Sequence, residues 1–258
     1  MPSLVFAAIL ALAPAEVITR LPAPEANQGV AVDRRSIYAV DNTRIAKYDR
    51  ATGARVARFQ GDPGKFAHMN SCAVIAAELV CAASNYPATP MRSQVEVFDP
   101  RTLIHKRSIP LGRQPGSLTF VDRRDGAWWA GFANYDGRGG EPGRDHRFTA
   151  LVRFDDHWRP TGQWTFPPEV LARFAPRSAS GGAFGADGRL YVTGHDLPEL
   201  YVLDVPRGGG VLKLAATIAI PVEGQAVAFD RSAKNLMFGI RRARREVVGF
   251  RLPPLETR

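Results

Sequence analysis

Five segments of the chain share one pattern of residues, and this repeat constrains the fold more than any other feature. Each segment opens with small or amide side chains, continues through a short apolar stretch, makes a tight polar turn and enters a second apolar stretch. The segments begin at Gln28, Asn70, Gly116, Ser180 and Gly224. Short apolar stretches bounded by turn residues predict β-strands. We therefore expect five copies of one β unit.

Two further strands are expected in each of the first four units. One ends in Asp, as in RIAKYD (44–49), and an outer strand follows, which in the fourth unit is VLKLAATIAI (211–220). Four strands per unit at a spacing of about 40 to 65 residues indicate the blades of a β-propeller. The fifth unit has three such stretches, and EVITRL (16–21) can supply its fourth strand and close the ring. The sequence predicts an all-β, single five-bladed β-propeller; a β-sandwich is the competing fold.

The stretch IYAVDNTRIAKYDRATGARVARF (37–59) resembles secreted β-propellers with YVTN, NHL or WD40-like repeats, in which a strand, a D-x-x-T-G turn and another strand recur. This resemblance implies the propeller fold and no single function, because propellers carry many activities. Among five-bladed propellers the chain is similar to plant-type glutaminyl cyclotransferases through Gln28-Gly29. Those enzymes carry a Glu-containing segment after the second strand, where this chain reads YAVDN (38–42). No catalytic residue is carried over from them.

The first fifteen residues, MPSLVFAAILALAPA, are apolar and end in Ala13-Pro14-Ala15. A small-x-small ending after a short apolar run is typical of a secretory signal peptide, and this run is too short to span a bilayer. We expect residues 1–15 to be a signal peptide and residues 16–258 to form the propeller; a buried first strand is the alternative. The protein is then expected in the periplasm or outside the cell, with no membrane span.

The chain has two cysteines, Cys72 and Cys81. If Ala76-Ala77 is the centre of a hairpin, the cysteines are cross-strand neighbours and close enough to form a disulfide. A disulfide agrees with an exported protein. Two buried free thiols are the alternative, and no second Cys pair or nearby His completes a metal site.

The formal net charge is +9, from 34 Lys and Arg against 25 Asp and Glu. A basic balance can indicate an anionic partner. The arginine pairs are spread along the chain, however, and no basic run is interleaved with aromatic residues. We therefore expect no nucleic-acid partner, and an Arg-rich solvated surface is the simpler interpretation.

Polar residues from all five units are expected at one end of the propeller axis, which we call the mouth. The first strand of a blade lines the axis and the second runs antiparallel to it, so the start of the first and the end of the second share one face. Two long connections, 85–91 and 134–147, reach this face and both begin with Asn-Tyr. The expected ligand-binding residues are Gln28, Asn70, Asn85, Tyr86, Asn134, Tyr135 and Gln225. Asn85 and Asn134 have the capping of β-turns as their alternative role, and the opposite face carries ordinary turn sequences such as DRRDG (122–126).

One function that fits this mouth is an enzyme acting on a small polar or anionic ligand. His68 and His195 titrate near neutrality and can transfer protons, and Arg242 can hold a carboxylate, so these three are the catalytic candidates. Lyase, cyclotransferase or hydrolase chemistry is consistent with this set. The chain lacks a G-x-S-x-G motif, so covalent serine catalysis is not expected.

The other function that fits is a non-catalytic periplasmic propeller that binds a small polar molecule or a glycan through Tyr rings and amides. The direction of the two His side chains separates the two functions. If both point into one cavity beside Arg242, the enzyme is favoured; if they point apart, the binding module is favoured.

No cofactor is expected. A variant of the enzyme would bind a divalent metal through His68, His195, Asp41 or Asp196, although this spacing matches no recognised ligand motif.

Overall fold

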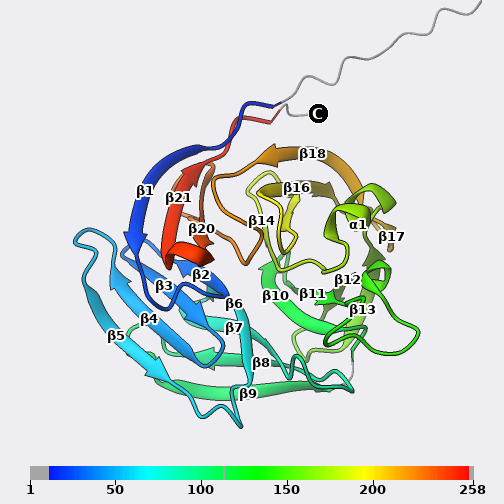
Figure 1. The fold of residues 1–258 in the computed structure, drawn as a ribbon, viewed down its shortest axis with the longest axis horizontal. Helices are drawn as coiled ribbons and strands as arrows, with labels where there is room; N and C mark the ends of the chain where they lie inside the picture. The colour runs from blue at the N-terminus through cyan, green and yellow to red at the C-terminus, as the bar shows by residue number, and fades with distance from the viewer. Residues whose placement is uncertain (1–11, 113, 256–258) are drawn as a thin grey trace, which may run out of the picture.

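The computed structural model describes residues 12–112 and 114–255, and in it five small sheets form a ring around one axis (Figure 1). Blade 1 contains β2 (Gly29–Val32), β3 (Ser36–Asp41), β4 (Arg44–Asp49) and β5 (Arg55–Gln60). Blade 2 contains β6 (His68–Ile75), β7 (Glu78–Ser84), β8 (Ser93–Phe98) and β9 (His105–Gly112). Blade 3 contains β10 (Ser117–Arg124), β11 (Ala127–Ala133), β12 (Ala150–Phe154) and β13 (Pro160–Thr165). Blade 4 contains β14 (Gly181–Phe184), β15 (Leu190–Thr193), β16 (Glu199–Asp204) and β18 (Lys213–Ala219).

Blade 5 is built from both ends of the described chain. It contains β19 (Ala228–Phe229), β20 (Leu236–Arg241), β21 (Glu246–Arg251) and, as its outer strand, β1 (Glu16–Pro22). The β1–β21 pairing runs from Glu16 opposite Arg251 to Pro22 opposite Glu246. The prediction of a five-bladed propeller closed by an N-terminal strand is confirmed. Residues 1–11, most of the expected signal peptide, lie outside the described residues.

The burial of each strand follows from its place in the blade. The blades pack face to face, so an inner or middle strand is covered on both sides, and every residue of β2 and β3 is buried. The outer strand β5 is mostly exposed, and along it exposed residues alternate with half-buried ones.

The turn between β4 and β5 is built around Asp49. Its side chain accepts hydrogen bonds from the backbone N–H groups of Ala51 and Thr52, and Gly53 at φ +72° completes the turn. The D-x-x-T-G pattern is therefore an Asx-type turn that needs a left-handed residue at its end.

The two cysteines lie opposite each other on β6 and β7 and are joined by a disulfide. The turn between the strands is formed by Ala76 and Ala77, both at positive φ (48° and 62°). This is the backbone geometry of a two-residue hairpin turn, as the sequence predicts.

Two elements were not predicted from the sequence. The short strand β17 (Gly210–Val211) leaves blade 4 and pairs in parallel with β13 of blade 3, so the expectation that residues 211–220 form one outer strand is wrong at its beginning. The cause is the Gly208–Gly210 run, whose three positive φ angles of 86°, 97° and 103° turn the chain toward blade 3. The other element is α1 (Pro168–Phe174), which connects blades 3 and 4 and buries Val170 and Phe174. Among the described residues, no helix is long and apolar enough to cross a membrane.

Candidate functional site

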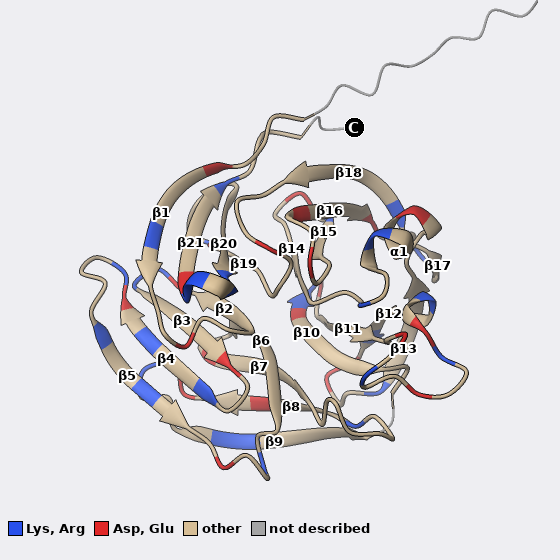
Figure 2. Cartoon of the chain, viewed as in Figure 1, with Lys and Arg blue, Asp and Glu red and all other residues tan. Residues whose placement is uncertain are grey.

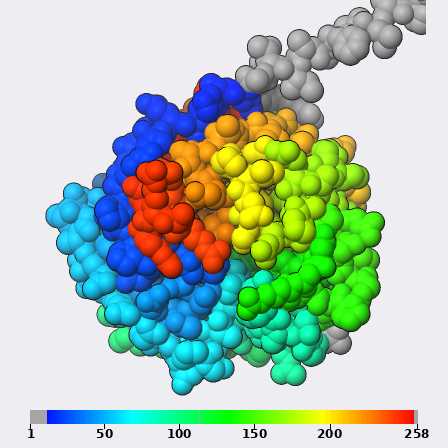
Figure 3. Space-filling model, in the orientation of Figure 1, coloured from blue at the N-terminus to red at the C-terminus, as the bar shows by residue number. Residues whose placement is uncertain are grey.

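The mouth is the face turned toward the viewer in Figures 1 to 3. Its connections come from every blade, and in Figure 3 the red, yellow, green and cyan segments meet around the centre of this face. The red turn beside the labels β20 and β2 in Figure 1 is η2 (Arg242–Arg244), a single 3-10 turn that follows β20. The side chains of this face fall into two groups, one over blades 5, 1, 2 and 3 and one between blades 4 and 5.

A row of three rings runs from blade 2 to blade 3. The ring centroids of His68 and Tyr86 are 5.0 Å apart, and those of Tyr86 and Tyr135 are also 5.0 Å apart. Gly139, in the long blade 3 connection, packs directly against Tyr86, because a Cβ added there would lie 2.3 Å from Tyr86 Cε2. The two expected Asn-Tyr connections thus bring both rings together, and the blade 3 connection fixes Tyr86 in place.

His68 is held in its neutral form by its surroundings. Burial lowers the pKa of His68 to about 4, and the nearby charge of Arg242 acts in the same direction, while the Asn70 side chain and Asp41 oppose the shift. The imidazole is therefore uncharged at neutral pH. Its two nitrogens then act as one hydrogen-bond donor and one acceptor.

Arg242 is fixed by an amide and not by a carboxylate. Its Nε donates to Asn27 Oδ1 at 3.0 Å, and Asn27 Nδ2 donates to Asp41 Oδ1 at 2.7 Å. The other carboxylate oxygen of Asp41, Oδ2, accepts a hydrogen bond from the guanidinium of Arg44. The positive charge of Arg44 is thus paired with Asp41, whereas the partner of the Arg242 guanidinium among the described residues is a neutral amide. Sequence analysis missed Asn27, although it directly precedes the Gln-Gly pair of the first unit.

Arg177, in the connection between α1 and β14, is a second cation at the mouth and was not among the residues expected from the sequence. Burial raises the pKa of Tyr135, and the charge of Arg177 acts against that rise, which places the guanidinium near the phenol. The backbone N–H of Asp136 donates to Pro176 O at 3.2 Å and holds this connection against blade 3. Within residues 12–112 and 114–255, Arg177 forms no hydrogen bond or ion pair through its side chain. The only signal in the sequence was its position just before the Ser-Gly start of the fourth unit.

His195 belongs to the second group of side chains. Its Nδ1 lies 2.5 Å from Asp196 Oδ1, and both side chains are partly exposed. Gln225 Nε2 donates weakly to His195 O at 3.5 Å, and Gln225 O accepts from Thr193 Oγ1 at 2.6 Å. Between the described residues, no hydrogen bond, ion pair or ring contact joins His195 to His68. The two His side chains are therefore not in direct contact with each other, and the prediction that both act on one ligand beside Arg242 stays a prediction.

The other expected ligand-binding residues are already engaged with the protein. Asn85 Nδ2 donates to Pro90 O and its Oδ1 accepts from the Arg92 N–H, so Asn85 braces its own connection. Asn134 Nδ2 donates to Pro115 O at 2.7 Å and to Phe148 O at 3.0 Å. Asn70 Nδ2 donates to Leu118 O at 2.9 Å.

Gln28 is buried beneath this surface, and its backbone joins blades 1 and 5 through the hydrogen bond from Ala226 N–H to Gln28 O. The amides of Asn85, Asn134 and Asn70 hold strands and connections in place, which leaves the half-buried rings, Arg177 and the exposed Arg242 as the polar groups that a ligand at the mouth could contact.

Among the described residues, the three that bring metal-ligand atoms within 4.8 Å of one another are Asp136, Asp145 and His146. They are not the expected set of His68, His195, Asp41 and Asp196. They line or adjoin a pocket of about 600 Å³ within the long blade 3 connection. His146 Nδ1 lies 2.6 Å from Asp136 Oδ1, and Asp145 holds the guanidinium of Arg147 at 2.5 Å. These contacts tie the three residues to one another and to Arg147, and they are consistent with a structural role in holding the connection together.

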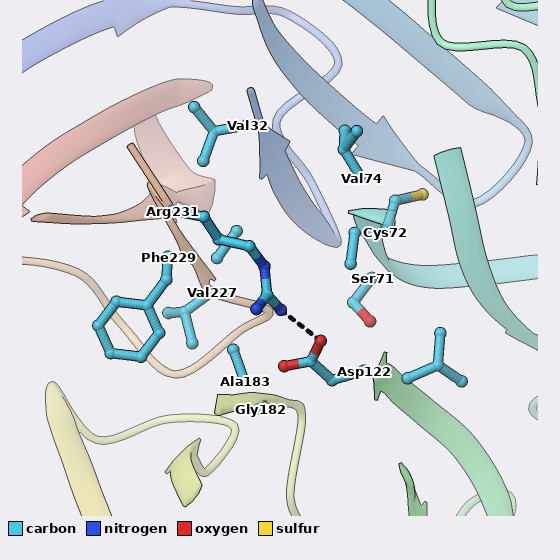
Figure 4. Close-up of a pocket in the computed structure, with 13 residues that line it drawn as sticks. Val32, Ser71, Cys72, Val74, Asp122, Gly182, Ala183, Val227, Phe229 and Arg231 are labelled. Atoms are coloured by element: carbon cyan, nitrogen blue, oxygen red, sulfur yellow. Dashed lines mark hydrogen bonds and ion pairs between the residues drawn. The ribbon is translucent and has the colours of Figure 1, made fainter. Parts of the chain in front are cut away.

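The opposite end of the axis is closed by an ion pair between blades (Figure 4). Asp122 accepts from Arg231 Nη2 at 2.5 Å and from the Phe184 N–H at 2.8 Å, and only 2% of its side chain is exposed. The expectation that residues 122–126 form an ordinary solvent turn is wrong for Asp122, because the end of β10 lies against blades 4 and 5. The cavity between these groups measures about 20 Å³, room for about one water molecule. This end of the axis therefore has no room for a ligand larger than a water molecule.

No protein-family model matches the sequence, and no curated protein matches it. Solved structures do match. The PQQ-bound aldose sugar dehydrogenase of Streptomyces coelicolor is 15% identical, with a TM-score of 0.54 over 95% of this chain and 84% of that one. A luciferin-regenerating enzyme is 12% identical, with a TM-score of 0.52 over 94% of this chain and 96% of that one. At these identities the likeness is one of architecture: it agrees with the propeller fold, and the chain's own sheets show that the propeller has five blades.

Proposed function

We propose that the protein is a binding propeller that holds a small anionic molecule at its mouth. The observation that carries this proposal is the state of Arg242, whose guanidinium is fixed in position by the amide of Asn27 and pairs with no acid among the described residues. An exposed cation that is held in place without a counter-charge is well suited to an anionic group of a ligand.

The neighbouring groups support an anion with a polar or ring-bearing body. Arg177 supplies a second positive charge on the far side of the ring row, beside Tyr135. The neutral His68 supplies a hydrogen-bond donor without a charge of its own, and the phenol group of Tyr86 can donate to ligand oxygens. Arginines at the two ends of a row of aromatic side chains would hold the charged group and position the rest of the molecule.

A binding role is favoured over catalysis because of the protonation state of His68. A general acid or base works best with a pKa close to the working pH, and a His with a pKa of about 4 is a weak base. Acid–base chemistry by His68, of the lyase, cyclotransferase or hydrolase kind, is the second candidate. It is favoured by one observation: the imidazole is neutral beside Arg242 and has a nitrogen able to accept a proton.

We also propose that the protein works outside the cytoplasm, in the periplasm or as a secreted protein. The Cys72–Cys81 disulfide supports this, since disulfides persist in oxidising compartments. The apolar segment 1–15 agrees with it. Fractionation of cells that express the full chain, followed by mass determination of the N-terminus, tests both statements; an intact segment on a cytoplasmic protein would contradict them.

The binding proposal is tested with a thermal-shift screen of small carboxylates, phosphate esters and neutral sugars, followed by calorimetric titration of the hits. We expect the hits to be anions. Losing a hydrogen bond to a charged group costs about 1.5–3 kcal/mol, so Arg242→Gln should weaken binding about 10- to 100-fold. Arg34→Gln, an exposed residue on the opposite face, is the matched control and should bind as the wild type does. Equal binding of neutral sugars, or an unchanged affinity in Arg242→Gln, would contradict the proposal. Turnover of a hit that is lost in His68→Gln would instead favour the enzyme.

A further inference from the structure

Four arginines crowd one short turn at the edge of the mouth. They are Arg241, Arg242, Arg244 and Arg245, in and beside η2. The last three of them are exposed, and Arg242 is the one tied to Asn27. Among the described residues, no acid pairs with Arg241, Arg244 or Arg245. Figure 2 shows this turn in blue on the front of the ring, beside β2 and β20.

Four neighbouring arginines without a carboxylate partner contrast with many other surface arginines of the described chain, although single arginines and the pair Arg34-Arg35 are also unpaired. Many guanidinium groups lie within ion-pair distance of a carboxylate on the same blade or the next. Such pairs are Arg44–Asp41, Arg50–Asp230, Arg55–Glu25, Arg107–Glu78, Arg123–Asp156, Arg173–Glu199, Arg189–Asp204 and Arg231–Asp122. The nearest acid in sequence to the turn, Glu246, is already held by Arg20 at 3.0 Å. No carboxylate within residues 12–112 and 114–255 therefore offsets the positive charge of the turn, which is available to a ligand.

The turn is also held in a defined position. The N–H of Ala23 donates to Arg245 O at 2.8 Å, and the N–H of Arg245 donates to Arg242 O at 3.2 Å. Arg245 itself sits at φ +52°, a conformation that the hydrogen bonds on either side maintain. Because a 3-10 turn rises only about 2 Å per residue, the arginines stay close to Arg242 along the chain. A ligand held by Arg242 therefore has further cations within reach of a second charged group.

We propose that Arg244 and Arg245 form a second anion subsite beside Arg242, so that the ligand of the mouth carries at least two negative charges. The inference rests on the proposed function and adds the class of ligand to it: a di- or tricarboxylate or a phosphate ester. Arg242 holds one anionic group at the inner edge of the mouth, and Arg244 and Arg245 hold another at its outer edge. Guanidinium groups bind carboxylate and phosphate oxygens equally well in geometry, so carboxylate ligands and phosphate ligands are tested separately.

Calorimetric titration with acetate, glutarate and citrate, and with phosphate and pyrophosphate, tests the inference on the full chain at low and physiological ionic strength. We expect citrate or pyrophosphate to bind at least about tenfold more tightly than acetate or phosphate. The double variant Arg244→Gln/Arg245→Gln should reduce that preference about tenfold. The control is Arg34→Gln/Arg35→Gln, which removes the same charge from an exposed turn on the opposite face and should keep the preference.

The outcomes separate the two proposals. If Arg242→Gln weakens every anion but Arg244→Gln/Arg245→Gln keeps the wild-type preference, the second subsite is wrong and the mouth site stands. If the control pair lowers the preference as much as the double variant does, the effect is one of net charge and the subsite is wrong. If no probe binds, or Arg242→Gln binds all of them unchanged, both proposals fail. Tight binding in the carboxylate arm alone, or the phosphate arm alone, identifies the anionic group.

Discussion

The ion pair that closes the far end of the axis makes a prediction with a characteristic pH dependence. The perturbation is Arg231→Met, which keeps an apolar stem but removes the cation from Asp122. Burial raises the pKa of Asp122, while Arg231 and the backbone N–H groups of Phe184 and Arg123 act against that rise. Without Arg231 the pKa of Asp122 should rise further, because the strongest opposing charge is gone.

The size of the effect follows from the exposure of the two partners. Removing one partner of a fully buried ion pair costs about 3–5 kcal/mol of unfolding free energy. Asp122 is only 2% exposed, but 52% of the Arg231 side chain is in solvent. Screening by that solvent reduces the expected loss to about 2 kcal/mol at neutral pH.

The pH dependence has a definite sign. An acid whose pKa is raised in the folded state contributes its stability below the unfolded pKa, and that contribution is lost as the pH rises through the folded pKa. Arg231→Met should therefore lose more stability at pH 8 than at pH 5, by about 1 kcal/mol or more, since each pKa unit is worth about 1.4 kcal/mol. Urea unfolding at both pH values measures this. An equal loss at both, or an equal loss when Asp122→Asn is already present, would refute the electrostatic reasoning.

Three further predictions concern stability. Replacing the Cys72–Cys81 pair by Ala should cost about 2–3 kcal/mol, the loop-closure value for cysteines nine residues apart, and a reductant should lower the Tm of the wild type but not of the variant. Because the pKa of His68 is lowered to about 4, its contribution to stability is present above the unfolded pKa near 6.5 and is lost as the pH falls. Between pH 7.5 and 5 the wild type should lose about 2 kcal/mol more than His68→Gln, and parallel unfolding curves would contradict this. Gly29→Ala places a Cβ 2.5 Å from Ala226 Cβ and should cost about 1–3 kcal/mol in chemical unfolding, whereas Gly137→Ala, with nothing within 4 Å, is the control and should cost far less.

The blades could be predicted from the sequence because their signals are local and repeated. Each strand is a short apolar stretch between turn residues, and five copies of the pattern agree with one another. The disulfide and the ring closure follow from the same pattern, since Cys72 and Cys81 flank one turn and EVITRL (16–21) was the only strand needed to complete the last blade. Repetition also explains why the face that carries the candidate site could be identified without a homologue.

The unpredicted parts of the fold depend on contacts between blades. Asp122 sits in a sequence that reads as a turn, and only the neighbouring blades bury it. The pairing of β17 with β13 of blade 3 depends on how close β13 lies to the Gly208–Gly210 run, which is distant from it in the sequence.

Part of the candidate site could be predicted from the sequence and part could not. The placement of His68 and Arg242 on one face follows from the order of the strands. The use of the Asn85 and Asn134 amides as braces depends on the conformation of long connections, which the sequence pattern does not encode.

The pairing of β1 with β21 has a consequence for the rate of folding. Blades 1 to 4 are made almost entirely from contiguous segments, so each can form its sheet from nearby residues as soon as those residues are available. Blade 5 must instead bring together strands from opposite ends of the described chain, and contacts of such large sequence separation form slowly. We expect the seam between β1 and β21 to be the last part of the ring to assemble and the first to open. The lifetime of the native ring would then be set by the hydrogen bonds of this one seam, and hydrogen exchange of the β1 amides would report it directly.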